Sequence, residues 1–150
     1  MKGYWNKPEA TAAAITEGAW FHSGDLVRMD EEGFVYILDR AKDMLIRGGE
    51  NIYCVEVEDA LYAHPAVMDA AVVAIPHKVL GEEVGAIVQV APGKQVSEEE
   101  LKAHVGKLLA AFKVPVKIEL RHEPLPRNPN GKILKTVLRE DMKKYSKDAA

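Results

Sequence analysis

The chain has 150 residues, of which 47% are hydrophobic and 29% are charged, with a formal net charge of -3. This length supports one ordinary domain with a hydrophobic core plus an appendage, and the mild, mixed charge excludes a typical nucleic-acid-binding protein. No apolar run reaches the ~18 residues of a transmembrane span, and the start lacks the apolar core of a signal peptide. We therefore expect a cytoplasmic protein, and the single cysteine, Cys54, which cannot form a disulfide within the chain, agrees with a reducing compartment.

The first third of the chain predicts a short helix, a β-hairpin and a charged junction. Residues 8–17 are alanine-rich with a proline at the start, which favours a short surface helix. Residues 26–29 and 34–38 carry β-forming side chains on either side of a turn that ends in Gly33, which predicts a hairpin. The segment 39–43 then reads Asp-Arg-Ala-Lys-Asp, a polar junction between two folded pieces.

The remaining residues predict a small α+β domain in which helices pack on a short mixed sheet. Ser97 followed by Glu100 forms a capping box, and Leu101, Val105, Leu108, Leu109 and Phe112 form an apolar stripe at helical spacing. The predicted elements, in chain order, are apolar residues 44–46 with a short extended piece to 52, helix 55–63, strands 67–75 and 84–91, the capped helix, strand 116–120 and helix 134–145.

Asp25 is the first candidate for chemistry, in the segment His22-Ser23-Gly24-Asp25-Leu26. An ionised carboxylate presents two acceptor oxygens, so Asp25 at the start of a strand could bind the vicinal hydroxyls of a nucleotide ribose. The competing interpretation is a turn former, because aspartate after glycine is common in turns.

Paired glycines follow the charged junction, in the segment Arg47-Gly48-Gly49-Glu50-Asn51. Composition alone is consistent with a solvated linker. The functional interpretation is a hinge at 39–43 followed by a glycine loop whose bare backbone lines a ligand tunnel.

Lys132 ends a proline-stiffened loop, Pro126-Arg127-Asn128-Pro129-Asn130-Gly131-Lys132, immediately before the last predicted helix. A lysine on a loop is usually a plain surface charge. A compact ammonium on a stiff turn can also stabilise charge that develops on a phosphate or carboxylate oxygen.

Other polar residues have ordinary interpretations. Basic residues recur every fourth position on the last predicted helix and indicate either a solvated face or a face that holds phosphates of ATP or CoA: Lys135, Arg139, Lys143 and Lys147. The dispersed histidines suggest no metal-ligand pair: His64, His77, His104 and His122. Cys54 is interpreted as a small buried hydrophobe.

Four strings in order make the chain resemble the C-terminal region of an acyl-CoA ligase of the adenylate-forming superfamily. They are GYWNKPEAT, GAWFHSGDL, DEEGFVYILDRAKDMLIRGGENIY and LPRNPNGKILKTVLRE. The resemblance implies three parts: residues 1–38 as the tail of an N-terminal AMP-binding domain, 39–43 as a hinge, and 44–150 as a mobile C-terminal α+β domain.

This resemblance implies a two-step ligase. A carboxylic acid, expected to be a fatty acid, reacts with ATP to give acyl-adenylate, and CoA then displaces AMP, with Mg²⁺ bound through ATP and largely by the missing N-terminal domain. Lys132 would be the catalytic lysine of adenylation. Asp25 and Arg40 would help bind the nucleotide, and Lys42 would be the hinge residue. Residues 48–51, that is Gly48, Gly49, Glu50 and Asn51, would line the CoA tunnel.

The chain departs from the family pattern in two respects. Position 54 is commonly proline in these ligases and is cysteine here, which should affect the stiffness of the following helix. The phosphate-binding loop and the acyl pocket of the family belong to its N-terminal domain, and no segment here can replace them. Two alternatives stay open: an adenylating domain that loads a carrier protein or feeds an oxidase reaction, and a non-catalytic interaction module.

Overall fold

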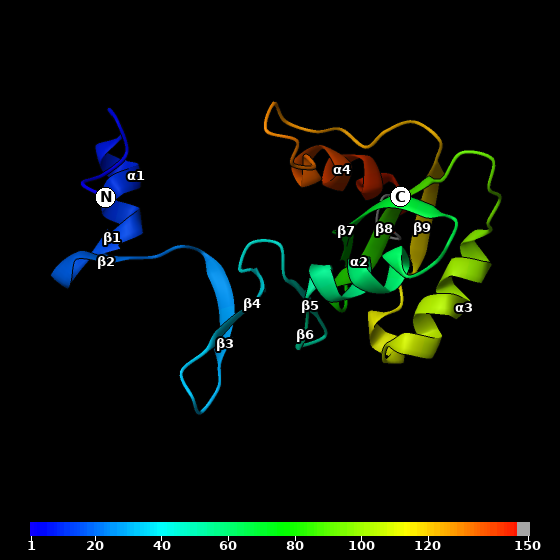
Figure 1. The fold of residues 1–150 in the computed structure, drawn as a ribbon, viewed down its shortest axis with the longest axis horizontal. Helices are drawn as coiled ribbons and strands as arrows, with labels where there is room; N and C mark the ends of the chain where they lie inside the picture. Colours follow the sequence, from blue (N-terminus) through cyan, green and yellow to red (C-terminus); the bar gives the residue numbers. More distant parts are fainter. Residues whose placement is uncertain (147–150) are drawn as a thin grey trace. The chain divides into compact units, whose positions relative to one another are not determined.

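The structure is a computed structural model that describes residues 1–146. The chain divides into two compact units, Met1–Lys42 and Asp43–Ala150 (Figure 1). The boundary between the units falls within the segment 39–43, at the Lys42–Asp43 bond.

The first unit is a string of small elements without a buried residue. It contains α1 (Pro8–Ala14), the β1–β2 pair (Ile15–Thr16 and Trp20–Phe21) around the 3-10 turn η1 (Glu17–Ala19), and the hairpin of β3 (Asp25–Met29) and β4 (Val35–Arg40). Helix α1 is shorter than predicted because the backbone becomes extended at Ile15 to pair with Phe21. Trp20 is 76% exposed and Ile37 is 72% exposed. An isolated two-stranded hairpin is marginal in water, so these apolar side chains mark a surface suited to being covered.

Strand β4 extends beyond its predicted end. It continues through Asp39 and Arg40, which pair with Leu26 and Asp25 of β3. Two of the five residues assigned to the charged junction are therefore in a strand, because the ladder with β3 satisfies their backbone groups.

The second unit is a five-stranded mixed sheet with helices on both faces (Figure 1). Strand β8 (Gly81–Val90) pairs antiparallel with β7 (Val67–His77) on one side and parallel with β9 (Lys117–Arg121) on the other. The remaining elements are β5 (Leu45–Arg47), β6 (Glu50–Ile52), α2 (Cys54–Tyr62), α3 (Glu98–Leu108), η2 (Ala111–Lys113), α4 (Lys135–Met142) and η3 (Lys143–Tyr145). This agrees with the predicted α+β class and element order.

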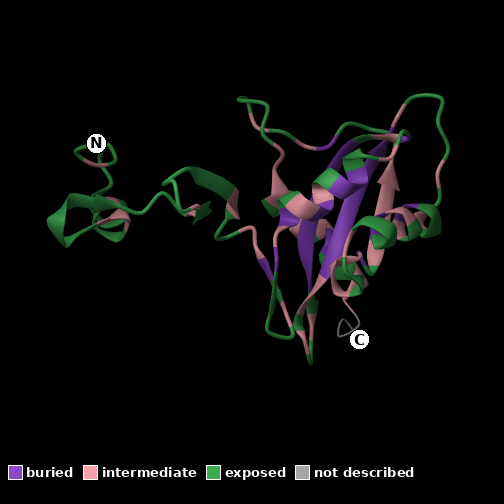
Figure 2. Ribbon diagram, turned by 60° about the horizontal axis from the view of Figure 1, so that its bottom comes forward, coloured by how far each residue is buried: buried purple, intermediate pink, exposed green. Residues whose placement is uncertain are grey.

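Alternation along β7 builds two cores, one on each face of the sheet, and Figure 2 shows the central strands as the buried part of the unit. Ala70, Val72 and Ala74 pack with α2 and α3. Ala71, Val73 and Ile75 pack with α4 through Leu138 and Met142. Because successive strand residues point to opposite faces, a strand covered on both sides needs the continuous apolar run seen in the sequence.

Helix α3 begins as predicted and ends earlier. The Glu100 backbone N–H donates to Ser97 Oγ at 3.1 Å, and Leu101 and Val105 are fully buried. The predicted apolar stripe was wrong at Leu108, which is 54% exposed. Leu108 is the last residue of α3, and the backbone becomes extended at Leu109, where the chain leaves the helix. Leu109 and Phe112 still pack against the core from outside α3.

Cys54 is 1% exposed, as expected of a small buried side chain. Across residues 1–146, no helix combines the length and the apolar character that crossing a bilayer requires.

Candidate functional site

The Lys132 loop is held in shape by its own hydrogen bonds. The Asn128 side-chain carbonyl accepts the backbone N–H groups of Asn130 at 3.0 Å and Lys132 at 2.9 Å, and Asn128 N–H donates to Lys132 O at 2.9 Å. Gly131 has a φ of +79°, which a side chain would disfavour. The loop is closed at its base by Leu134 N–H donating to Pro126 O at 2.8 Å. Lys132 is therefore an exposed lysine on a tight, well-defined turn.

Gly48 and Gly49 form the two-residue turn of the β5–β6 hairpin, between the paired residues Arg47 and Glu50. Their φ angles are +56° and +92°, the left-handed conformation at both positions that such turns require. Gly48 N–H donates to Leu80 O at 2.9 Å, and a Cβ at Gly49 would meet no atom within 4 Å. The turn therefore presents bare backbone at Gly49, while Glu50 and Asn51 follow it as exposed residues.

The β5–β6 hairpin is fixed to the central sheet by charged contacts. Arg47 pairs with Glu83 at 2.6 Å, and Ile46 N–H donates to a Glu82 carboxylate oxygen at 2.8 Å. These contacts hold the glycine turn in one orientation within the unit.

The Lys132 loop and the glycine turn lie at opposite ends of the second unit. In Figure 1 the orange segment before α4 runs along one edge of the unit, and the β5–β6 hairpin projects from the other. Two exposed features of one rigid body at opposite ends can approach the same small ligand only in two different orientations of that body.

The structure brings Asp25 and Arg40 together in the first unit. They face each other in the β3–β4 register, and Arg40 Nε lies 3.4 Å from Asp25 Oδ1. Ser23 Oγ accepts the Asp25 backbone N–H at 3.2 Å. The Asp25 side chain is 28% exposed, so a carboxylate oxygen is accessible to a ligand while the guanidinium lies beside it.

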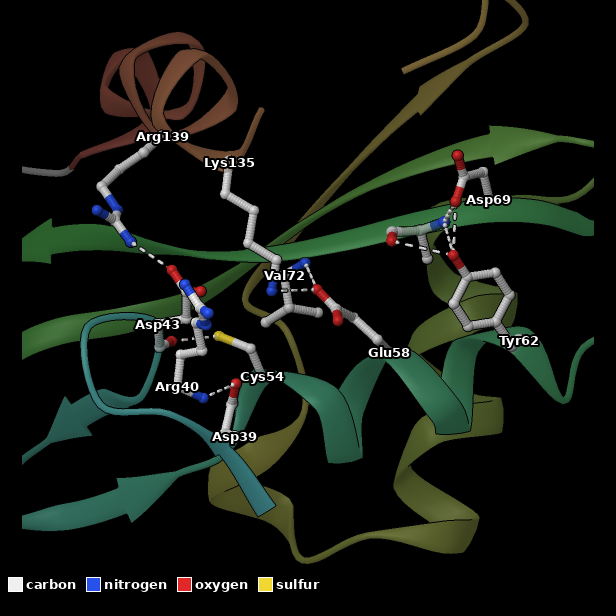
Figure 3. A network of polar contacts seen from close by, with 11 residues as sticks. Asp39, Arg40, Asp43, Cys54, Glu58, Tyr62, Asp69, Val72, Lys135 and Arg139 are labelled. Carbon is white, nitrogen blue, oxygen red and sulfur yellow. Dashed lines mark hydrogen bonds and ion pairs between the residues drawn. The ribbon is translucent and has the colours of Figure 1, made fainter. Parts of the chain in front are cut away.

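The start of the second unit is tied to its helices at Asp43 (Figure 3). The Cys54 thiol donates to Asp43 O at 2.7 Å, and Arg139 Nη2 lies 3.9 Å from Asp43 Oδ1. Lys42 precedes this anchored residue as the last residue of the first unit.

Lys135 of α4 departs from the solvated basic face that the four-residue spacing suggested, whereas Lys143, in η3, is exposed. Lys135 Nζ lies 2.7 Å from Glu58 Oε1, and the same oxygen accepts Val72 N–H at 2.8 Å (Figure 3). Burial lowers the pKa of Lys135, but the charge of Glu58 and its hydrogen bond raise this pKa by a larger amount. The pKa of Lys135 therefore lies above its usual value. Lys135 is thus a structural cation that links α4 to α2, and Lys147 lies outside the described residues.

Two of the dispersed histidines are neighbours in the fold. The rings of His64 and His104 contact edge to face with centroids 5.0 Å apart, and a His104 ring nitrogen lies 3.1 Å from Ala60 O. Within the described part of the chain, no group of three or more His, Cys, Asp or Glu side chains could hold a metal ion. Sequence spacing missed this pair because α2 and α3 are brought together only by packing on the sheet.

Comparisons with known proteins show the family of the chain. The family described as "AMP-binding enzyme C-terminal domain" matches residues 56–132, just over half of the chain. Among curated relatives, the long-chain-fatty-acid–CoA ligase FadD13 of Mycobacterium tuberculosis is 49% identical over 93% of this chain and 27% of its own length. The long-chain-fatty-acid–CoA ligase of Bacillus subtilis is 50% identical over 94% of the chain and 25% of its length.

Two more comparisons concern a relative named for a carrier protein and a solved structure. The fatty acid–[acyl-carrier-protein] ligase ScoC of Streptomyces coeruleorubidus is 44% identical over 93% of the chain and 27% of its length. Among solved structures, ATP-bound MatB from Rhodopseudomonas palustris has a TM-score of 0.86 at 40% identity, over 96% of this chain and 28% of that one. The chain spans about a quarter of the length of these relatives. It belongs to the family of AMP-binding enzyme C-terminal domains.

Proposed function

We propose that the chain is the C-terminal part of an ATP-dependent acyl-CoA synthetase. In the first step a carboxylate attacks the α-phosphorus of ATP and releases pyrophosphate, and in the second the CoA thiol attacks the acyl carbon and releases AMP. The observation that carries this proposal is the placement of an exposed lysine loop and a bare glycine turn at opposite ends of one rigid unit. Each end would serve one step as the unit rotates.

Lys132 would act in the adenylation step. Negative charge builds on the oxygens around the α-phosphorus as pyrophosphate leaves, and a fixed ammonium stabilises that charge more in the transition state than in the ground state. The tight turn at Asn128 and Gly131 suits this role, because it presents the lysine without a flexible loop beneath it.

Gly48 and Gly49 would act in the thioester step. Bare backbone at the turn lets the narrow pantetheine arm of CoA pass close to the main chain, where a side chain would block it. Glu50 and Asn51 follow the turn as exposed polar residues that could contact the arm.

Asp25 and Arg40 would bind the nucleotide. The Asp25 carboxylate would accept hydrogen bonds from the ribose hydroxyls, and Arg40 would orient that carboxylate. Lys42, within the hinge 39–43, would be the pivot between the two orientations. Mg²⁺ would enter with ATP and be held largely by the N-terminal AMP-binding domain, as the family resemblance implies.

A fatty acid is the proposed substrate, and the cytoplasm is the proposed location. Two of the relatives are named long-chain-fatty-acid–CoA ligases, and this supports the acyl class. The missing N-terminal domain, which would build the acyl pocket, is the proposed partner of the chain.

Lys132→Ala in the full-length enzyme tests the proposal. We expect the rate of acyl-adenylate formation, measured by pyrophosphate exchange, to fall by about 100-fold or more. A loss of this size is typical of removing one charge-stabilising group. Thioester formation from supplied acyl-adenylate should stay within about twofold. Lys94→Ala is a matched control, because Lys94 is also exposed and follows a glycine of positive φ, Gly93. Equal loss of both half-reactions in Lys132→Ala would contradict the proposal.

A carrier protein is the second candidate acceptor. The similarity to a fatty acid–[acyl-carrier-protein] ligase favours it, because the phosphopantetheine arm of a carrier protein is chemically the same as that of CoA. AMP release by the full-length enzyme that depends on free CoA supports the synthetase, whereas release only with a pantetheinylated carrier protein supports the alternative.

A further inference from the structure

Asp69 is a buried carboxylate that belongs to none of the features above. It lies in β7 and is 7% exposed. The Tyr62 hydroxyl donates to Asp69 Oδ1 at 2.5 Å, and the same oxygen accepts Ala70 N–H at 3.1 Å (Figure 3). Burial raises the pKa of Tyr62 above its usual value, and the hydrogen bond to Asp69 adds to this rise. A buried carboxylate also requires a positive partner.

That partner is Arg127, in the loop that ends in Lys132. Arg127 Nη2 contacts Asp69 Oδ2 as a hydrogen-bonded ion pair. Arg127 Nη1 donates to the carbonyl of Gly131 at 2.5 Å. One planar guanidinium therefore joins a buried carboxylate of the sheet to the carbonyl immediately before Lys132.

The other contacts of the loop have a different role. The bonds to the Asn128 side chain and the turn at Gly131 give the loop its internal shape. The Leu134–Pro126 hydrogen bond closes its base. Arg127 joins the segment beside Lys132 to the central sheet through charged hydrogen bonds, and Ile133 joins it through apolar packing against the core cluster of β7, β8 and α4. Arg127 is thus the polar anchor of the loop, and its orientation helps to set where the loop points.

We propose that Asp69, acting through Arg127, is a positioning residue for Lys132 in acyl-adenylate formation. This inference rests on the proposed function of Lys132. Neither side chain contacts the reacting atoms. Asp69 fixes the guanidinium, the guanidinium fixes the Gly131 carbonyl, and the position of Lys132 follows from that peptide. A displacement of about 1 Å in a charge-stabilising group can cost about 100-fold in rate, so such an anchor has kinetic consequences.

The test uses Asp69→Asn and Arg127→Lys in the full-length enzyme, with both half-reactions measured. Asn keeps the shape of Asp69 but removes its charge, and Lys keeps the charge of Arg127 but cannot hold two acceptors in one plane. We expect kcat for acyl-adenylate formation to fall about tenfold or more, with KM for ATP and thioester formation from supplied acyl-adenylate each within about twofold. Glu98→Gln is the control, because it also removes a carboxylate that is paired with cations, in this case Lys102 and Lys117, at the start of α3.

A double-mutant cycle separates positioning from loss of stability. If Asp69 acts through Lys132, Asp69→Asn should cause no further loss of adenylation in the Lys132→Ala enzyme. Losses that multiply, or an equal slowing of both half-reactions by Asp69→Asn, would overturn the inference. If Asp69→Asn does not fold, as judged by circular dichroism, Arg127→Gln replaces it in the same cycle, since the Arg127 side chain is 44% exposed.

Failure of the proposed function gives a different result. In that case Lys132→Ala alone either leaves adenylation unchanged or slows both half-reactions equally. If Lys132→Ala removes adenylation while Asp69→Asn and Arg127→Lys leave it unchanged, the function stands and the positioning inference is wrong.

Discussion

Replacing Glu98 with glutamine should remove a large electrostatic contribution to the stability of the second unit. Glu98 is the first residue of α3 and joins that helix to β9. Its carboxylate lies 2.7 Å from Lys102 Nζ and 2.5 Å from Lys117 Nζ, and accepts Ile118 N–H at 3.1 Å. Glu98→Gln keeps the size of the side chain but removes the charge that both lysines contact.

The magnitude follows from the pKa of Glu98. Burial raises this pKa, but the hydrogen bonds from Lys102, Lys117 and Ile118 N–H lower it by more, from 4.5 to about 2. A shift of that size corresponds to about 3 kcal/mol, and screening at this partly exposed site reduces the expectation to about 2 kcal/mol. Because the folded-state pKa is the lower one, the stabilisation is present above pH 4.5 and is lost as the pH falls toward 2.

Urea unfolding of the 150-residue chain, followed by circular dichroism at pH 7 and pH 3, measures the effect. We expect Glu98→Gln to lower the free energy of unfolding by about 2 kcal/mol at pH 7 and by less than half of that at pH 3. Glu99→Gln is the matched control, because Glu99 is an exposed carboxylate in the same first turn. A loss below about 0.5 kcal/mol, or one that is the same at both pH values, would refute the reasoning.

Three further predictions concern the proposed site. Gly48→Ala should destabilise the β5–β6 turn by about 1 kcal/mol, because its φ is +56° and its Cβ would lie 3.1 Å from Leu80, and it should slow thioester formation more than adenylation in half-reaction assays. Asp25→Asn should raise the KM for ATP about tenfold by weakening the ribose contact, whereas an unchanged KM would exclude that contact. Lys135→Met should lower the free energy of unfolding by about 2 kcal/mol in urea titrations, because it removes the ammonium that lies 2.7 Å from Glu58 Oε1. Unchanged Michaelis constants for ATP and CoA would exclude phosphate binding by Lys135.

The second unit could be predicted from sequence because its signals are local. The Ser97 cap and the paired glycines at 48 and 49 each fix a backbone conformation through nearby residues. The apolar run of β7 has the length and composition of a strand that is buried on both faces, and its partner β8 follows directly in sequence. Errors occurred where tertiary context decides. Strand β4 runs on to Arg40 because β3 supplies the ladder, and Leu108 is exposed because the chain leaves α3 at Leu109.

The residues of the proposed site could be named from sequence, but their supporting contacts could not. Lys132 and Gly48 lie in sequence motifs that resemble those of the family. Asp69 and Glu58 looked like ordinary residues of a strand and a helix, because the cations that they bind lie more than 50 positions away in sequence, in the Lys132 loop and in α4. Such pairs are specified by the topology, which places the loop before α4 against the same sheet as β7.

Contacts on either side of Lys42 indicate which backbone dihedrals would change if the second unit rotated between two orientations. Arg40 is the last residue of β4, and Ala41 N–H donates to Gly24 O at 2.8 Å within the first unit. Asp43 is bound by Cys54 and Arg139 within the second unit. Lys42 lies between these two tied positions, so its backbone dihedrals can change without breaking either set of contacts. The sequence resemblance proposes Lys42 as the pivot, and these contacts give a physical reason for choosing it within the segment 39–43.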